Sequence, residues 1–593
     1  MRLSTRPVVL AVAIGGLLLA GCHHKDKNAP LAFVPADTPY VIANLDVLDD
    51  DTRKAMLAQA DAQLPAQLAQ INSSADELAT KDADTARLIH AFTAEFSGKT
   101  IESFAQNAGL NLKGHSAFYG LGLSPVLRMD LSDPKAFDAF VDRLETAYGK
   151  KLDVASVDGV SYRRHVSAET GTEVILAVIG KQAIAAVLPA DASQTLLRQA
   201  LGLDRPSESL LDDGGLEKLA KAKDYQPWAV GELDLTRLLP LIAGGKDPLF
   251  AALLKAHAQA ESAKTGEPVA NQTQIPPSCA TDAARIAARV PQISFGYTQL
   301  DASHQNLRWD VAVADDIGKT FSGLQVGLPG LGSDGTGPFD LSVALPMGAV
   351  RTFWSAQADA VAAKPFTCPA LTDLNDSFAK LGLLMQKAAV PPLGDLTGLR
   401  IVIDSLTPSS DGSMPKLTGR VVIGSSNPAG LLAMAQMTVP ALGQLRVNAD
   451  GKPTELPPTM TSMFGEPGWV AMGAKALVIA LGTGEDAHLA EALNAPTGDE
   501  GRMLRMHLTG AMYGNWATLM EQKAEAMASL SAAMDHDPAA DPNGSGQQAA
   551  QAAARAKAQF SAMQSQAARI KDITGEVHVT DNDVIITSQT TLK

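Results

Sequence analysis

Apolar and polar residues alternate along several short stretches of this chain, and these stretches come in adjacent pairs. Residues 174–179 are followed almost at once by 183–188, and residues 293–300 by 307–314. Strands joined by a short turn form antiparallel hairpins, whereas parallel strands need a long crossover. The pattern therefore predicts an antiparallel sheet and not a doubly wound parallel one.

One of these stretches also indicates how the sheet meets solvent. The run Asn306-Leu307-Arg308-Trp309-Asp310-Val311 alternates strictly between polar and apolar residues. Such alternation is typical of an antiparallel sheet with one face in water and the other on a core. We therefore expect an α+β fold in which helices pack on one face of an antiparallel sheet.

The pattern of elements occurs twice along the chain. Asp133-Pro134 precedes an amphipathic stretch, and Asn427-Pro428 precedes another. Asp and Asn are good helix caps, and Pro is tolerated at the first helical position. Two apolar strands and a helix follow each of these helices, and the offset between the copies stays near 292 to 294 residues. A constant offset favours two related halves, although two unrelated α+β domains with common motifs remain the alternative.

The repeat suggests a domain organisation for the chain. We expect a first α+β half over residues 32–320 and a second over 338–593. Residues 321–337, which include a glycine-rich stretch from Gly327 to Gly337, have the composition of a linker between them. Residues 535–548 are rich in Ala, Asp, Gly and Gln, and predict a disordered loop within the second half.

The N-terminus has the parts of an export signal. Arg2 and Arg6 form a positive region, residues 8–19 are apolar, and Leu19-Ala20-Gly21-Cys22 follows. The apolar run is shorter than the ~20 residues that a membrane-spanning helix needs. The segment resembles the bacterial lipoprotein signal, which implies cleavage between Gly21 and Cys22 and attachment of fatty acyl chains, palmitate among them, to Cys22. An ordinary secretory signal with an incidental cysteine and a short uncleaved anchor are the alternatives.

This resemblance also implies a location. Residues 1–21 would be removed, residues 22–31 would form a tether, and the acyl chains on Cys22 would hold the protein at a membrane. His23, and not Asp, follows the cysteine. In the enterobacterial sorting rule that choice favours the outer membrane, so we expect a lipid-anchored envelope protein that faces the periplasm.

Composition limits the classes of partner. Apolar residues make up 46% of the chain and charged residues 19%, values typical of a folded protein. The net charge is −15, which gives no electrostatic basis for binding nucleic acid. The same charge would repel anionic lipid headgroups, so membrane association is expected to come from the anchor.

Cysteine usage points to a disulfide. With Cys22 lipidated, Cys279 and Cys368 are the remaining cysteines, and each lies in a proline-marked loop just before a helical stretch. Because the periplasm is oxidising, we expect the two to form a disulfide. Two buried free thiols are the alternative, and a metal site would need more ligands than these.

No catalytic motif is complete. Gly98-Lys99-Thr100 and Gly318-Lys319-Thr320 resemble the end of a phosphate-binding loop, but both lack its first glycine. The sequence contains no Gly-x-Ser-x-Gly, His-Glu-x-x-His or Cys-x-x-Cys. His23 and His24 in the tether and Asp535-His536-Asp537 are weak metal candidates. We therefore assign no catalytic residue, metal or cofactor.

Three short motifs of the first half resemble a bacterial family. They are the segment from Leu31 to Val41, Asp133-Pro134-Lys135-Ala136-Phe137, and Asp158-Gly159-Val160-Ser161-Tyr162. Together they are similar to the uncharacterised DUF3352-type proteins. The resemblance implies no substrate, cofactor or catalytic residue.

Three functions follow as hypotheses. The leading one is a non-enzymatic, membrane-tethered binding or scaffold protein that acts on an envelope protein partner. The second is a carrier or sensor of a hydrophobic ligand, with a pocket between helices and sheet. The third is an envelope hydrolase whose catalytic groups are dispersed along the sequence.

Overall fold

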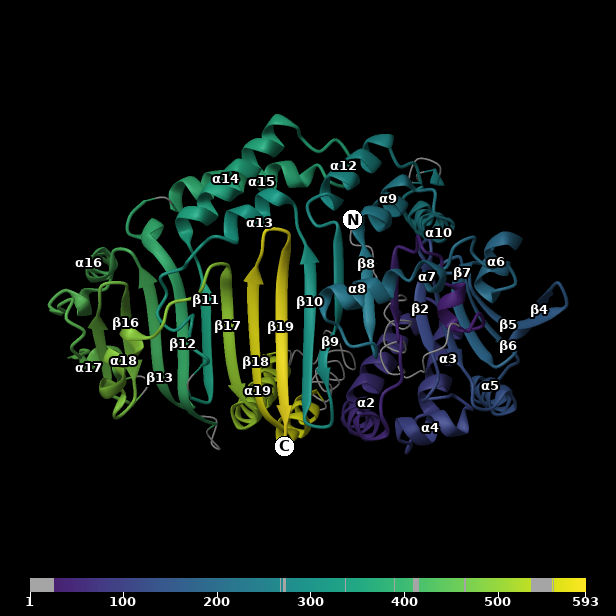
Figure 1. Cartoon of the computed structure of the whole chain (residues 1–593), viewed down its shortest axis with the longest axis horizontal. Coiled ribbons are helices and arrows are strands. Elements are labelled where there is room, and N and C mark those ends of the chain that lie inside the picture. The colour runs from purple at the N-terminus through teal and green to yellow at the C-terminus, as the bar shows by residue number, and fades with distance from the viewer. Residues whose placement is uncertain are drawn as a thin grey trace. The chain divides into compact units, whose positions relative to one another are not determined.

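The strands described in the computed structural model pair in antiparallel fashion, and helices alternate with them along the chain, so the fold is α+β (Figure 1). The structure describes residues 26–593 apart from 267, 270–272, 336, 389, 409–414, 463–464, 535–556 and 558. The predicted cleavage and lipidation site at Gly21 and Cys22, the histidines at 23 and 24, and the loop expected at 535–548 lie outside the described residues.

The chain divides into two units. Unit 1 takes the residues up to 302 together with 307–311 and 367–370, and unit 2 takes 303–306, 312–366 and 371–593. The four residues 367–370 thus belong to unit 1 although the chain on both sides of them belongs to unit 2.

Unit 1 contains helices before, between and after its strands. Its elements are η1 (Pro30–Phe33), β1 (Tyr40–Ala43), α2 (Asp50–Ala79), α3 (Ala83–Ala94), α4 (Ile101–Asn107), β2 (Ser116–Leu121), β3 (Ser124–Asp130), α5 (Pro134–Tyr148), β4 (Asp153–Val157), β5 (Val160–Ser167), β6 (Thr172–Ile179), β7 (Gln182–Pro189), α6 (Gln194–Leu201), α7 (Leu210–Asp213), α8 (Gly215–Lys223), β8 (Val230–Asp234), α9 (Leu235–Gly244), α10 (Pro248–Thr265), α12 (Pro277–Ala287), β9 (Gln292–Leu300) and the middle of β10 (His304–Ala312).

Unit 2 has a similar alternation. Its elements are α13 (Asp315–Phe321), β11 (Phe339–Ala344), α14 (Met347–Ala363), α15 (Asp373–Ala388), η2 (Leu393–Asp395), β12 (Leu396–Thr407), β13 (Lys416–Ser425), α16 (Pro428–Thr438), η3 (Pro440–Leu442), β14 (Thr454–Glu455), α17 (Pro458–Thr461), β15 (Gly468–Met472), β16 (Ala476–Leu481), η4 (Glu485–His488), α18 (Leu489–Asn494), β17 (Arg502–Thr509), α19 (Gly510–Met534), β18 (Ile570–Val579) and β19 (Asp583–Leu592).

Hydrogen-bonded neighbours define the strand order of each unit. In unit 1 the order is β4-β5-β6-β7-β3-β2-β1-β8-β9. In unit 2 it is β14-β15-β16-β13-β12-β11-β17-β18-β19. The first strand of each unit, β1 or β11, therefore lies in the middle of its sheet.

Helix α5 illustrates how local sequence produces these elements. The side chain of Asp133 accepts hydrogen bonds from the first backbone N–H groups, and Pro134 occupies the first turn. Gly149 ends the helix in the left-handed conformation, with a φ of 89°. A buried stripe at helical spacing faces the sheet: Phe137, Phe140, Val141 and Leu144.

Helices cover both faces of the sheet of unit 1, whereas the sequence predicted helices on one face. On one face, α6, α7 and α8 pack through Leu201, Leu210 and Leu216 onto a core that includes Tyr119 and Ile184. On the opposite face, α3, α4 and α5 pack onto another core with apolar residues of β3, β6 and β7. The prediction is wrong because β3 and β7 carry apolar residues at successive positions, which supplies both faces.

The burial of the alternating stretch at 306–311 also differs from the prediction. Asp310, expected in water, is 2% exposed, whereas Trp309, expected in the core, is 37% exposed. Asp310 is buried with its partners: Arg308 Nη2 lies 2.7 Å from its Oδ1, and the Tyr225 hydroxyl donates to its Oδ2 at 2.5 Å. Alternation separates the two faces of a strand correctly but does not say which face is covered.

Candidate functional site: an open apolar face above buried charges

Apolar side chains form continuous rows across the sheet of unit 2. Directly paired residues of neighbouring strands point to the same face of a sheet, so the strand registers define these rows. One row consists of Ile586, Val577, Leu504, Val343, Leu399, Ile423, Leu477 and Met472. The next row on the same face consists of Met506, Leu341, Ile401, Val421, Ile479 and Val470.

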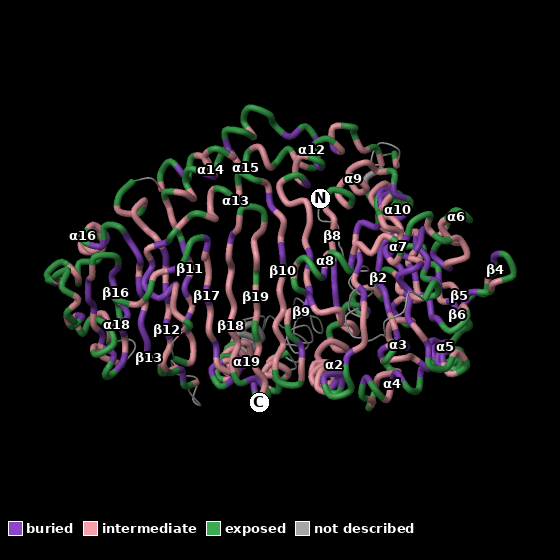
Figure 2. Tube along the Cα trace, in the orientation of Figure 1, coloured by how far each residue is buried: buried purple, intermediate pink, exposed green. Residues whose placement is uncertain are grey.

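Much of this face is not covered. We call the following residues the open apolar face: Leu341, Val343, Leu399, Ile401, Val421, Ile479, Leu504, Met506, Val577 and Ile586. All of them are half-buried or exposed (Figure 2), and Ile479 and Ile586 reach 41% and 39% exposure. Within the described part of the chain, none of them belongs to a core cluster.

Helices pack on the face at its borders. Residues of α16 and η3, with Leu431 among them, cover Val470, Met472 and Leu477. Residues of α19, with Met512 among them, pack near Leu508, Phe339 and Ile403. The open apolar face lies on the strands between these two contacts, so it is a surface bordered by helices.

The opposite face of the same strands is buried and charged. Asp340 on β11 is 0% exposed, Arg505 on β17 is 2% and Arg400 on β12 is 3%. Arg400 donates to the carboxylate through two atoms, from Nε to Oδ1 at 3.0 Å and from Nη2 to Oδ2 at 2.8 Å. Arg505 Nη2 lies 2.8 Å from Oδ1. The three side chains form one buried ionic cluster with an excess of positive charge.

The ionic cluster keeps its aspartate charged. Burial alone raises the pKa of Asp340, but the hydrogen bonds and charges of Arg400 and Arg505 outweigh it, so the net pKa is lowered. Burial lowers the pKa of Arg505, and the charge of Asp340 opposes that shift. The carboxylate and the guanidinium groups attract each other, and this attraction offsets the cost of removing their charges from water.

A glycine-rich strap, residues 326–335, covers this cluster. Leu328 and Leu331 of the strap are fully buried at 0% exposure, and the carbonyl oxygen of Gly330 accepts a hydrogen bond of 3.0 Å from Arg505 Nη2. The backbone N–H groups of Gly330 and Gly332 both donate to the carbonyl of Pro496, at 2.9 and 3.1 Å. The strap is thus bound to unit 2 along its length.

This strap lies within residues 321–337, for which the composition predicts a linker. Its burial against unit 2 is a feature that composition does not predict. A Cβ atom on Gly330 would collide with the guanidinium of Arg400, and one on Gly335 would lie 2.6 Å from Arg505 Nη1. The glycines are needed because the backbone passes directly over two arginines, and not because the segment is flexible.

A second charged group is buried on the same face. Arg420 Nη1 lies 2.7 Å from Asp404 Oδ2 and 3.0 Å from Glu485 Oε2. Burial, followed by the nearby charge of Asp404, raises the pKa of Glu485, while Arg420 opposes the shift. The buried face of this sheet therefore carries the two ionic groups together with apolar residues such as Val402, Val422 and Val478, whereas the middle of the opposite, apolar face stays open.

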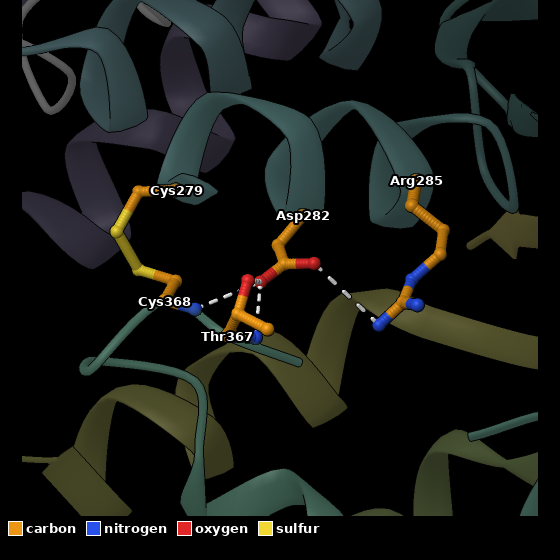
Figure 3. The surroundings of a disulfide bond; sticks show 5 residues. All are labelled: Cys279, Asp282, Arg285, Thr367 and Cys368. Atoms are coloured by element: carbon orange, nitrogen blue, oxygen red, sulfur yellow. Dashed lines mark hydrogen bonds and ion pairs between the residues drawn. A yellow bond between two sulfur atoms is a disulfide. The ribbon is translucent and has the colours of Figure 1, made fainter. Parts of the chain in front are cut away.

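The disulfide expected from the sequence is present. Cys279 of α12 and Cys368 are joined, and both belong to unit 1. Figure 3 shows Asp282, one helical turn after Cys279, beside the same loop: its Oδ2 accepts from the N–H groups of Thr367 at 2.7 Å and Cys368 at 2.9 Å. Arg285 approaches the other carboxylate oxygen at 3.7 Å. The arrangement fixes residues 367–368 to α12 and offers no reactive group.

A chain of hydrogen bonds around His165 is the best candidate for dispersed catalytic groups. Ser167 Oγ donates to Asp82 Oδ2 at 2.6 Å, and Thr85 Oγ1 lies 2.7 Å from Asp82 and 2.9 Å from His165 Nε2. A nucleophile needs its hydroxyl on the imidazole and the carboxylate behind it. Here Thr85 separates the carboxylate from the imidazole, and Asp82 caps α3. The geometry is that of a helix cap.

One small cavity is present in unit 1, with a volume of about 190 Å³. Thr38, Glu232, Arg237 and Gln292 are among the residues that line it. Gln292 Nε2 donates to Glu232 Oε1 at 2.6 Å, and burial raises the pKa of Glu232. Ligand pockets usually occupy ~300–1,000 Å³ with mostly apolar walls, so this cavity does not fit a lipid.

The remaining motifs have structural positions. Thr100 caps α4 by accepting from the N–H of Ser103, and residues 318–320 lie inside α13. Among the described residues, no group of His, Cys, Asp or Glu is placed to hold a metal ion. No described helix is both long and apolar enough to cross a bilayer.

Comparisons with protein-family models, with curated proteins and with solved structures found no match to this chain.

Proposed function

We propose that this protein is a cell-envelope lipoprotein that binds a protein partner through the open apolar face of unit 2. The observation that carries the proposal is that this sheet encloses the Asp340 cluster on one face and leaves Ile479 and Ile586 exposed on the other. Large exposed apolar patches mark interaction sites. The role is that of a non-enzymatic binding or scaffold protein.

The shape of the face favours a protein over a small hydrophobic ligand. Its side chains are spread along strands from β16 to β19 and are not gathered in an enclosed space. An extended apolar surface is what an amphipathic element of another protein covers. The alternative is that the protein carries a hydrophobic ligand, and the mass of a cross-linked adduct distinguishes that ligand from a protein partner.

The location of the protein is part of the same proposal. The lipobox-like sequence ending at Cys22 and the histidine after it support a lipid anchor at the outer membrane, facing the periplasm. The Cys279–Cys368 disulfide supports an oxidising compartment. An anchored binding protein would hold its partner close to the membrane.

We also propose that the two units arose by duplication. Their strand orders correspond one to one, with β1, β2, β3, β6, β7, β8 and β9 matched by β11, β12, β13, β15, β16, β17 and β18. Asp133 of α5 and Asn427 of α16 cap the two helices that follow the third strand of each unit. The sequence offset of 292 to 294 residues between the elements around 132–201 and those around 426–493 supports the same conclusion.

Site-specific photo-cross-linking tests the binding surface. A photoreactive amino acid at position 479 or 586 should give a discrete adduct of protein size in intact cells, because both side chains lie on the open apolar face. Position 589 is the matched control: Gln589 is also exposed and also on β19, but it points to the opposite face of the strand. The adducts are measured by immunoblotting and identified by mass spectrometry.

Equal adducts from positions 479, 586 and 589, or adducts from none of them, would contradict a protein-binding face. An adduct of lipid mass from 479 and 586 would replace the protein partner with a hydrophobic ligand.

The anchor has a separate test. Cys22→Ser should abolish acylation and move the protein from the membrane pellet to the soluble or uncleaved precursor fraction, because the acyl chains provide the membrane affinity. Fractionation followed by intact-mass measurement checks this result. A correctly processed Cys22→Ser protein that still pellets fully with the outer membrane would refute the anchor.

A further inference from the structure

Helix α15 of unit 2 carries an exposed stripe of two leucines between two lysines. Lys380, Leu383, Leu384 and Lys387 are spaced i, i+3, i+4 and i+7, so they share one side of the helix. Leu383 and Leu384 are 60% and 56% exposed, and both lysines are exposed. Leucines this exposed contribute nothing to the core of the unit.

The other side of the helix provides the packing that α15 needs. Met385 is buried at 8% exposure, and the rings of Trp354 on α14 and Phe378 on α15 lie 6.4 Å apart. The backbone of Gly382 passes so close to α14 that a Cβ there would lie 3.1 Å from Ala358 Cβ. The hairpin of α14 and α15 is therefore stabilised without the exposed leucines.

More exposed apolar residues follow the helix. Val390 is 61% exposed and Leu393, at the start of η2, is 44% exposed. Leu345, just before α14, is 43% exposed. Its N–H donates to the carbonyl oxygen of Thr397, two residues after η2, so Leu345 lies close to the end of η2. We call these residues and the stripe together the basic apolar patch: Leu345, Lys380, Leu383, Leu384, Lys387, Val390 and Leu393.

The local charge of this patch is opposite to that of the whole chain. Lys380 and Lys387 are the charged residues within the patch, and the nearest acids along the chain are Asp376, one turn before Lys380, and Asp395, two residues after Leu393, in a chain with a net charge of −15. Among the described residues, neither lysine is recorded in an ion pair. Charges beyond about 10 Å are largely screened at physiological salt, so the acids elsewhere in the chain act little here. Asp376 lies outside the two lysines, which flank the leucines directly, so a surface that covers the leucines lies between two positive charges.

We propose that the basic apolar patch lies on a phospholipid surface that contains anionic lipids. The leucines would insert at the boundary between headgroups and acyl chains, and the two lysines would extend to phosphate groups at either end of the stripe. Basic and apolar residues on one face of a helix are the combination that such a surface binds. This contact would add to the Cys22 anchor and orient unit 2 on the membrane.

Vesicle cosedimentation tests the proposal with an unlipidated chain of residues 23–593, exported with a cleavable secretory signal in place of residues 1–22. Because this chain carries no acyl group, the result is independent of the anchor. The open apolar face is the same in the chain with the wild-type patch and in the patch variants, so a difference between them reports on the patch. The wild-type patch should bind vesicles of equal amounts of phosphatidylethanolamine and phosphatidylglycerol, and should bind phosphatidylcholine vesicles far more weakly. Leu383→Gln/Leu384→Gln and Lys380→Glu/Lys387→Glu should each lower the binding constant about ten-fold or more.

A matched variant controls for net charge. Lys54→Glu/Lys135→Glu changes the net charge by the same amount at two exposed lysines of unit 1, and should bind vesicles like the wild type. Absence of wild-type binding, or binding that both patch variants retain, would overturn the proposal. So would a dimer, detected by sedimentation velocity, that Leu383→Gln/Leu384→Gln dissociates, because the patch would then be covered by a second copy.

Discussion

The substitution Asp340→Ala should lower the free energy of unfolding of unit 2 by about 3 to 5 kcal/mol. It removes the carboxylate that neutralises Arg400 and Arg505 and leaves two guanidinium groups buried at 3% and 2% exposure. Hydrogen exchange of peptides from β11, β12 and β17 across a urea series measures the change. The loss should appear in unit 2 and leave the peptides of unit 1 unchanged.

The acid dependence has a defined sign. Because the pKa of Asp340 is lowered in the folded protein, its contribution is fully present above the ordinary Asp pKa of ~3.9 and disappears as the pH falls through the lower folded value. The Asp340→Ala variant lacks this acid-sensitive contribution. The difference in free energy of unfolding between the wild type and the variant should therefore shrink as the pH falls from ~3.9 through the lower folded pKa.

Two variants identify the cause of the loss. Asp572→Ala removes a half-exposed carboxylate from the same sheet, 3.5 Å from His507, and should cost less than about 1 kcal/mol. Asp340→Val/Arg400→Met/Arg505→Met removes the three charges together and should recover most of the stability. A loss for Asp340→Ala no larger than that for Asp572→Ala would show that the cluster is not a buried ionic network.

Removal of the disulfide should have a similar effect on unit 1. The bond joins residues separated by 89 positions, and the chain-entropy argument gives about 4 to 5 kcal/mol for a loop of this length. Cys279→Ser/Cys368→Ser should therefore expose α12 to exchange at much lower urea than the wild type. The side chain of Asp282 would still accept from Thr367 and Cys368, but two hydrogen bonds cannot restrict the unfolded chain.

Reductant provides the internal control for this prediction. It should lower the stability of the wild type to that of the double-serine variant and leave the variant itself unchanged. If the double-serine variant unfolds within about 1 kcal/mol of the wild type, the cross-link contributes little and the packing around α12 is sufficient.

Local features of this fold could be predicted from the sequence. The hairpin predicted at 174–179 and 183–188 is β6–β7, and Asp133 and Asn427 cap the helices that begin at Pro134 and Pro428. The disulfide followed from two cysteines and an oxidising compartment. The hairpin and the helix caps depend on residues that are neighbours in the sequence. The disulfide follows from the small number of cysteines, so none of these predictions needs three-dimensional information.

The open apolar face could not be predicted in the same way. Arg400, Ile401, Val402 and Ile403 are one charged and three apolar residues, so polarity does not separate their two faces, and the charge suggests that the arginine side meets water. Arg400 is buried because Asp340 and Arg505, 60 positions before it and 105 after it, complete an ionic cluster. Pairings over such separations are set by strand order, which a single sequence does not contain. The sequence does contain one indication of the buried cluster: Asp340, Arg400 and Arg505 each interrupt an otherwise mostly apolar strand.

The strap also changes how this protein can be divided for study. Composition invites a cut near residue 338, immediately before β11. A second unit started there would lack Leu328 and Leu331, which have no exposure in the intact chain, and the carbonyl of Gly330 that accepts from Arg505. An autonomous fragment has to begin upstream of Val326, so the boundary of the folding unit lies before its glycines and not among them.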